Sequence, residues 1–164
     1  KSRIAGENLT EVYPELTEVY QVIHGIPGFG EIRPEETETG SMIYAVKPGD
    51  GSAREQAASC QRVIGGLANI TKEYATKRYR SNVMNWGMIP FQMKEEPGFE
   101  VGDYIFVPNI RQALDGDMKE IKAYVIRQGK AEEISLYVAD MTSDERKIVK
   151  AGCLINYNRA RKNQ

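Results

Sequence analysis

Histidine and cysteine are scarce in this sequence of 164 residues, and their scarcity limits the metal chemistry that the chain can support. His24 is the only histidine, so no histidine cluster can build a metal site, and we expect this residue to be structural or exposed. The two cysteines, Cys60 and Cys153, form neither a Cys-x-x-Cys metal pattern nor a disulfide framework. Free cysteines are typical of a reducing compartment, so we expect a cytoplasmic protein.

Long apolar runs and an excess of charge are also missing. No segment approaches the ~20 apolar residues of a membrane span, and the start of the chain shows no signal-peptide pattern. The 22 Lys and Arg residues nearly balance the 23 Asp and Glu residues, and a net charge of −1 gives no reason to expect a nucleic-acid or membrane partner. An anionic ligand must therefore be bound by a local arrangement of hydrogen-bond donors.

Apolar residues are present in sufficient number for a hydrophobic core, since they make up 41% of the sequence. That proportion at this length suits a single compact domain over residues 1–164, with an N-terminal helix and a linker in residues 1–40. The sequence begins at Lys1 rather than at a methionine, so we expect the chain to be part of a longer protein.

The pattern of apolar residues predicts where helices and strands lie. Spacings of three and four predict helices over 7–24 (with a break at Pro14), about 53–64, 72–86, and from Thr142 to the basic end near Lys162. Short or alternating apolar runs predict strands over 41–47, 67–71, 88–93 and 103–107, and a hairpin of 121–126 and 134–138. Pro90 indicates that its strand lies at a sheet edge or that the strand ends there. Strands and helices that alternate first, followed by antiparallel strands, predict a mixed, layered α/β domain.

Several residues on the predicted helices could be interpreted as functional, but their spacing favours packing. Cys60 lies late in an apolar helical stretch, so we expect it to pack in the core rather than to act as a redox group. Tyr74, Tyr79 and Trp86 could stack on a ligand, but their helical spacing predicts core packing as well.

The most informative segment is the glycine-rich turn Pro48-Gly-Asp-Gly-Ser-Ala-Arg-Glu, which joins a strand to a helix. The unpaired N–H groups at a helix start bind anions, and Arg54 can add a planar grip on a carboxylate. The turn therefore offers an anion cradle with the Ser52 hydroxyl at its centre. The simpler and commoner arrangement is that Ser52 caps the helix, with Glu55 completing a capping box, and that Arg54 makes a surface ion pair. The spacing leaves both open, but it excludes a Walker phosphate loop and a Gly-x-Ser-x-Gly elbow.

The block Gly49-Asp-Gly-Ser-Ala-Arg-Glu-Gln-Ala-Ala is followed, in order, by further motifs at Val63–Ala75, Arg80–Phe91, Gly102–Ile105 and Ala151–Asn156. This series resembles the aconitase and isopropylmalate isomerase superfamily, whose signature is Gly-x-Gly-Ser-Ser-Arg-Glu-His/Gln-Ala-Ala. A colinear series of motifs is far more specific than the signature block alone.

The resemblance implies a swivelling three-layer β/β/α domain with a mixed sheet. It also implies that Ser52 is the catalytic base and that Arg54 binds a substrate carboxylate, with Gly51 and Ala53 beside them at the substrate. A 4Fe–4S cluster bound by another domain or subunit, and not by this chain, would supply the Lewis acid. We therefore expect a hydro-lyase that dehydrates and rehydrates citrate, isocitrate or a related hydroxy-tricarboxylate, and we expect the isolated chain to be inactive.

The sequence also departs from the family pattern. Ala53 replaces the second serine of the signature, so one donor to the substrate is lost, which could change the acid that is accepted. The family's early arginine has no clear counterpart, and Arg3 and Arg33 are candidates by position only. Three arrangements stay open: the C-terminal domain of a longer hydro-lyase, the free small subunit of an isopropylmalate or homoaconitate isomerase, and a non-catalytic anion-binding module. In the first two, the partner is the cluster-bearing domains or a large subunit.

Overall fold

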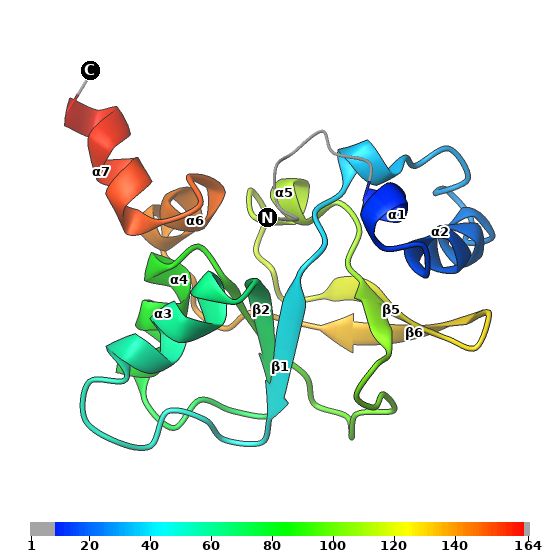
Figure 1. The fold of residues 1–164 in the computed structure, drawn as a ribbon. Helices are drawn as coiled ribbons and strands as arrows, with labels where there is room; N and C mark the ends of the chain where they lie inside the picture. The colour runs from blue at the N-terminus through cyan, green and yellow to red at the C-terminus, as the bar shows by residue number, and fades with distance from the viewer. Residues whose placement is uncertain (1–8, 163–164) are drawn as a thin grey trace. The chain divides into compact units, whose positions relative to one another are not determined.

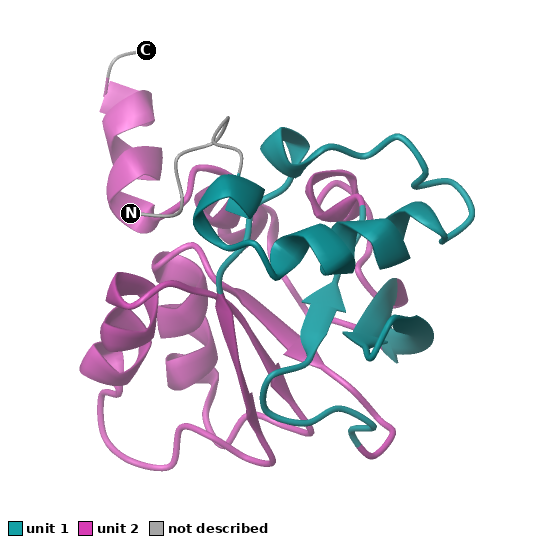
Figure 2. Cartoon of the chain, turned by 45° about the vertical axis from the view of Figure 1, so that its right-hand side comes forward, with its two compact units in different colours: residues 1–40, 97–108, 122–135 teal, residues 41–96, 109–121, 136–164 magenta. Residues whose placement is uncertain are grey.

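The computed structural model describes residues 9–162, and the contacts between residues divide the chain into two compact units (Figure 2). Each unit gathers segments that are distant in the sequence. The first takes residues up to 40 together with 97–108 and 122–135, and the second takes 41–96, 109–121 and 136–164. We describe each unit separately.

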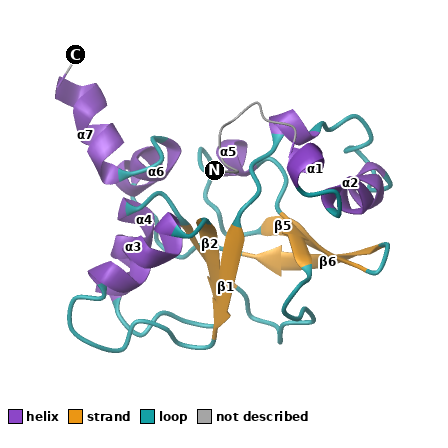
Figure 3. Ribbon diagram, in the orientation of Figure 1, coloured by secondary structure: helices purple, strands orange, loops and turns teal. Residues whose placement is uncertain are grey.

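The first unit combines short helices with an antiparallel sheet, of which Figure 3 labels β5 and β6. The order of the strands in this sheet is β4-β5-β6. Its helices are α1 (Leu9–Val12), α2 (Leu16–His24) and the 3₁₀ turn η1 (Pro34–Glu36). The strands of the sheet are β4 (Tyr104–Phe106), β5 (Ile121–Arg127) and β6 (Lys130–Leu136). Pro14 separates α1 from α2, as predicted, because it cannot donate the backbone hydrogen bond that a continuous helix needs. The predicted hairpin is confirmed: Gln128 and Gly129 form its turn with φ values of 47° and 73°.

An apolar cluster lies at the centre of this unit. Leu16, Tyr20 and Ile23 of α2 are 3–6% exposed and recur at the spacing of one helix face. They pack with Leu9 of α1 and Ile126 of β5. The hydroxyl groups of Tyr20 and Thr37 are hydrogen-bonded to each other. The first unit therefore has a core of its own.

The second unit is built on a parallel sheet in the order β1-β2-β3. Figure 1 labels the first two of these strands. Its strands are β1 (Ser41–Ala45), β2 (Gly66–Thr71) and β3 (Ile89–Gln92). Its helices are α3 (Glu55–Val63), α4 (Lys77–Asn85), α5 (Ile110–Ala113), α6 (Ser143–Lys150) and α7 (Leu154–Lys162). The predicted α/β class is confirmed, and the parallel and antiparallel strands are divided between two sheets. Pro90 lies in β3, at one end of the parallel sheet order, as its missing N–H requires.

Helices α3 and α4 lie on the same side of the parallel sheet (Figures 1 and 2). The buried residues between them include Ala58 of α3 and Tyr79 and Val83 of α4, with exposed fractions of 0–3%. Tyr74 and Trp86 pack against this cluster, so the prediction that the aromatic residues serve packing is confirmed. The helices therefore form a rigid layer beside the connections that join the parallel strands.

Several predicted helices begin or end at other residues than expected. Helix α4 begins at Lys77 rather than Lys72, because the N–H groups of Lys72 and Glu73 donate to the carbonyl of Val46 and Thr76 caps the helix. The predicted last helix is two helices. Gly152, with φ of 85°, turns the chain between α6 and α7. The predicted cap of α6 is confirmed, since Thr142 and Glu145 form a complete capping box.

The prediction that Cys60 packs in the core is wrong, because its side chain is exposed. The inner face of α3 runs through Ala58, Gln61 and Arg62, at spacings of three and four, and this leaves Cys60 on the outer face. Cys153 is partly buried in the turn before α7. None of the helices in residues 9–162 is long and apolar enough to cross a membrane.

Candidate functional site

The glycine-rich turn leaves the C-terminal end of β1 and runs to the start of α3 (Figure 1). A second connection, from β2 to α4, runs beside it. The N–H groups of Lys72 and Glu73 donate to the Val46 carbonyl at 3.2 and 3.1 Å, and that of Ala75 donates to the Pro48 carbonyl at 3.0 Å. Both connections thus leave the carboxyl ends of the parallel strands, which is where open α/β sheets bind their ligands.

Three side chains of the α4 segment donate hydrogen bonds to carbonyl oxygens of the turn. The Thr76 hydroxyl donates to Gly49 at 3.1 Å. The Arg78 guanidinium donates to Ser52 at 2.9 Å. The Asn82 amide donates to Ala53 at 2.7 Å. The turn is therefore attached to α4 by its backbone, over most of the length between β1 and α3. We call residues 49–54 the site loop.

Tyr79 provides the surface on which the site loop rests. A Cβ atom placed on Gly49 would lie 2.5 Å from the Cβ of Tyr79, and Gly49 has φ of 95°, so only glycine fits this position. Tyr79 itself is 3% exposed, and its hydroxyl accepts hydrogen bonds from Gln61 at 2.9 Å and Asn69 at 3.2 Å. The site loop therefore rests on a buried ring whose hydroxyl is hydrogen-bonded to two other side chains.

The neighbouring tyrosine, Tyr74, keeps its hydroxyl group protonated. The ring centroids of Tyr74 and Tyr79 are 6.1 Å apart. Burial raises the pKa of the Tyr74 hydroxyl far above its usual range. At the edge of the same region, the Lys47 ammonium pairs with Glu73 at 2.6 Å, and the hydrogen bond to Glu73 raises the pKa of Lys47. Neither Tyr74 nor Lys47 is therefore placed to take a proton from a ligand at neutral pH.

The predicted helix cap is wrong. Helix α3 begins at Glu55, two residues later than expected, and its N-cap position is Arg54 in the left-handed conformation, with φ of 54° and no side-chain cap. The backbone cannot bring Ser52 to the cap position, because the Ser52 carbonyl is bound by Arg78 and the chain turns through Gly51, with φ of 146°. Ser52 is exposed and its hydroxyl is not used to start the helix. Capping therefore does not explain this serine.

Arg54 folds back over the glycine that precedes Ser52. A Cβ atom on Gly51 would clash with the guanidinium of Arg54, so the arginine lies directly against the Gly51 backbone. Gly51, Ser52, Ala53 and Arg54 are all exposed, and they follow one another along a single turn. The four predicted site residues thus form one open surface beside the start of α3.

The peptide planes of the site loop give this surface its polarity. All described peptide bonds are trans, and in a trans peptide the N–H points opposite to the preceding C=O. Because the carbonyls of Ser52 and Ala53 point to α4, the N–H groups of Ala53 and Arg54 point away from it. Successive N–H groups that point the same way, next to a helix start, form an anion-binding concavity. The arrangement suits a carboxylate or an alkoxide.

Thr76, Arg78 and Asn82 were not predicted as functional residues. Asn82 and Arg80 belong to one of the matching motifs, and this was the only signal in the sequence that pointed to α4. Of the two early arginines, Arg3 lies outside the described residues. Arg33 belongs to the first unit, where it forms an ion pair with Glu36 at 3.0 Å, and the hydrogen bond to Glu36 raises the pKa of Arg33.

The remaining features of the described chain do not offer another site of this kind. Within residues 9–162, no group of three or more His, Cys, Asp or Glu side chains could hold a metal ion, so these residues do not fit a 4Fe–4S cluster. A hollow of about 510 Å³ in the second unit is lined by residues such as Lys94, Lys119, Tyr137 and Arg146, and it includes no residue of the site loop. His24 is exposed and its Nε2 lies 2.8 Å from the Ile32 carbonyl oxygen, as expected for a structural residue.

Comparison with known proteins places the site loop inside a recognised family region. The family model of the aconitase C-terminal domain matches residues 35–96, which include β1, the site loop, α3, β2, α4 and β3. The methanogen homoaconitase small subunit of Methanocaldococcus jannaschii is 31% identical to the chain over 155 residues. That alignment covers 92% of the chain and 81% of the relative.

Proposed function

Because the chain belongs to the aconitase and isopropylmalate isomerase superfamily, as its small domain, we propose that it is the small subunit of a hydro-lyase and completes an active site carried by a larger partner. The observation that carries the proposal is the site loop. It presents the exposed Ser52, which caps no helix, and Arg54 two residues later, and its backbone carbonyls are hydrogen-bonded to α4. The similar protein is named as a small subunit, which favours a separate subunit over the C-terminal domain of one long chain.

In this proposal, Ser52 takes the proton from the carbon next to the substrate's hydroxyl-bearing carbon. A serine hydroxyl is a poor base unless its alkoxide is stabilised. A helix start contributes roughly 0.3–2 kcal/mol, which corresponds to about one pKa unit. This is too little alone, so the N–H groups of Ala53 and Arg54 and the exclusion of water must add to it. Both N–H groups lie on the side of the site loop that faces away from α4.

Arg54 binds a substrate carboxylate in this proposal. Its guanidinium offers two parallel N–H donors, and its position against Gly51 limits its freedom before substrate arrives. Ala53 leaves space beside it where the family signature has a second hydroxyl. When bound by the partner subunit, a 4Fe–4S cluster supplies the Lewis acid for the leaving hydroxide. The chain therefore contributes the base and a carboxylate grip, and the partner contributes the metal.

The substrate class is a small hydroxy acid with two or three carboxylates. The relative is a homoaconitase subunit, which supports a homocitrate-type tricarboxylate as the first acid to test, followed by citrate, methylcitrate and isopropylmalate. The loss of the second signature serine at Ala53 allows an acid other than the one accepted by aconitases.

The test uses the complete enzyme, which is this chain assembled with its cluster-bearing partner. Hydration of the unsaturated acid is followed by the loss of its ultraviolet absorbance for wild type, Ser52→Ala and the control Ser143→Ala, an exposed serine at the start of α6. We expect Ser52→Ala to lower kcat on the order of 10²–10⁴-fold with little change in KM, and we expect Ser143→Ala to match wild type. Equal, measurable rates for all three proteins would refute the assignment of Ser52 as the base, whereas no hydration of any tested acid by any of them would favour a non-catalytic anion-binding module.

A further inference from the structure

Helix α4 does more than cover the sheet, because two of its polar side chains donate hydrogen bonds to the site loop. Thr76 has a second role, since its hydroxyl also accepts from the Tyr79 N–H and caps α4 at 3.2 Å. Within residues 9–162, the cap of α4 is made by Thr76 and not by Arg78 or Asn82. Each of them donates to one carbonyl of the site loop, Arg78 to Ser52 and Asn82 to Ala53. The two bonded carbonyls belong to consecutive peptide groups, on either side of the Ala53 Cα.

We propose that Arg78 and Asn82 are positioning residues that aim the Ser52 and Arg54 backbone at the substrate. The Arg78 bond fixes the Ser52–Ala53 peptide plane, and the Asn82 bond fixes the Ala53–Arg54 plane. Fixing these planes also fixes the two N–H groups that point away from α4. It fixes the Cα atoms from which the Ser52 hydroxyl and the Arg54 guanidinium extend. Neither α4 side chain touches the substrate in this proposal.

Stability alone is a weaker explanation for these bonds. Arg78 is exposed and Asn82 is partly exposed, so water can replace either donor when the side chain is shortened. The geometry of a reacting group is less tolerant, since a displacement of about 1 Å can cost on the order of 10²-fold in rate. Loss of either hydrogen bond should therefore have a larger effect on kcat than on the free energy of unfolding.

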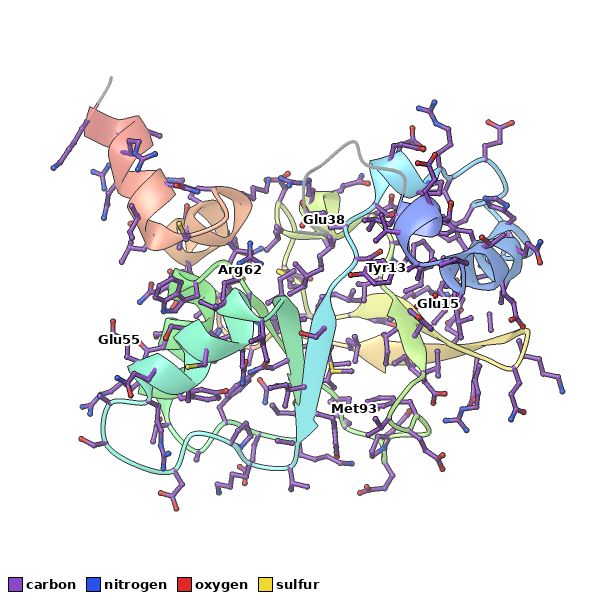
Figure 4. The ribbon with its side chains drawn as sticks, viewed as in Figure 1. Tyr13, Glu15, Glu38, Glu55, Arg62 and Met93 are labelled. Carbon is purple, nitrogen blue, oxygen red and sulfur yellow. The ribbon has the colours of Figure 1, made fainter. Side chains whose placement is uncertain are left out.

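A matched control exists on α3. The Arg62 guanidinium also donates to a backbone carbonyl, that of Gly66, at 3.1 Å. Figure 4 shows Arg62 and Glu55 at opposite ends of α3, so Arg62 lies away from the end that the site loop enters. The two arginines make the same kind of bond at a similar distance, and only Arg78 binds the site loop. A difference between them then reports on position rather than on the loss of a surface hydrogen bond.

The inference rests on the proposed function, and the experiment separates the two. In the complete enzyme, kcat and KM are measured for Arg78→Met, Arg78→Lys, Asn82→Leu and Arg62→Met, and for Arg78→Met combined with Ser52→Ala. Binding of tricarballylate, which carries three carboxylates and no hydroxyl, is measured by calorimetry, and urea unfolding is measured for each chain.

We expect Arg78→Met and Asn82→Leu to lower kcat by about 10–100-fold or to weaken tricarballylate binding by about 10-fold, with unfolding midpoints close to wild type. Arg78→Lys should recover most of the loss, Arg62→Met should match wild type, and Arg78→Met should lower the residual rate of Ser52→Ala very little, because the two residues act as a unit. Wild-type kcat and tricarballylate affinity in Arg78→Met and Asn82→Leu would overturn the inference, even if Ser52→Ala is inactive. If Ser52→Ala is fully active, the proposed base fails, and weakened tricarballylate binding in the α4 variants still supports their positioning role.

Discussion

Gly87 and Gly152 meet backbone to backbone. A Cβ atom on Gly87 would overlap the carbonyl group of Gly152, which forms the turn between α6 and α7. Gly87 follows α4, and its N–H donates to the Met84 carbonyl at 2.8 Å, so this contact joins the end of α4 to the α6–α7 turn. Both glycines have positive φ, 71° and 85°.

Gly87→Ala should therefore destabilise the protein in two ways. A left-handed alanine costs about 1–2 kcal/mol, and the overlap with rigid backbone adds about 1–3 kcal/mol. Gly129→Ala is the matched control, since Gly129 has φ of 73° and open space around it. Urea unfolding should show the larger loss for Gly87→Ala. Equal losses of stability for the two variants would mean that the α6–α7 turn moves to make room for the methyl group, and that Gly87 and Gly152 are not tightly packed.

Removal of the hydroxyl group of Thr142, before α6, should lower the stability of the protein more than removal of that of Ser52, before α3. Thr142→Ala removes a complete capping box and should cost about 1 kcal/mol. Ser52→Ala removes no cap and should change the free energy of unfolding by less than about 0.5 kcal/mol. Urea midpoints at neutral pH measure both. A loss for Ser52→Ala as large as that for Thr142→Ala would restore the capping interpretation of Ser52.

The ion pair of Asp103 and Arg127 should make stability depend on pH. Arg127 donates to the Asp103 carboxylate at 2.5 and 2.8 Å, and the hydrogen bond from Arg127 lowers the pKa of Asp103 below its usual value of 3.8. A lowered pKa in the folded state means that the ionised form stabilises the fold above the unfolded pKa, and that this contribution disappears as pH falls through the folded pKa.

Asp103→Asn provides the comparison, because asparagine does not titrate. The stability advantage of wild type over this variant should be constant from neutral pH to about pH 5 and should shrink at lower pH. Urea unfolding of both proteins at neutral pH and near pH 3 measures it. An advantage that is the same at both pH values would show that the pair adds nothing through ionisation.

Gly51 and Arg54 should act as one unit in substrate binding. Gly51→Ala places a methyl group where the guanidinium lies and should displace it, and Arg54→Gln removes it. In the complete enzyme, each change should raise KM by about 10-fold or more, the scale of a hydrogen bond to a charged group. The double variant should be no worse than the poorer single variant. Arg159→Gln, an exposed arginine of α7, is the control and should leave KM unchanged. Additive effects of the two site changes would separate Gly51 from Arg54.

The elements that depend on local sequence were predicted well. The periodicity of α2, the break at Pro14, the hairpin turn at Gln128 and Gly129, and the cap at Thr142 are all decided by neighbouring residues, and the structure confirms them. The predicted strands of the parallel sheet are also present. Local signals were sufficient wherever no distant residue competed for the same backbone groups.

The errors arose where distant residues did compete. A capping box at Ser52 and Glu55 is plausible from spacing, but Arg78 lies 26 residues away and binds the Ser52 carbonyl. Helix α4 starts late because Val46 binds the N–H groups of Lys72 and Glu73. Cys60 is exposed because the buried face of α3 depends on which side meets the sheet, which a short helix with a single buried alanine does not announce. The roles of Arg78 and Asn82 required the fold, because nothing in the spacing joins them to the site loop.

The attachment of the site loop through its carbonyl groups has a consequence for how such a site can change over time. Every amino acid carries a backbone carbonyl, so the hydrogen bonds from the α4 segment to the turn do not depend on which side chains stand at Asp50, Ser52 and Ala53. The side chains at Asp50 and Ala53 can therefore diversify while the path of the loop stays the same, and a new acid preference can evolve without a new loop conformation. A library randomised at Asp50 and Ala53, with α4 kept constant, would sample substrate range while the fold stays the same.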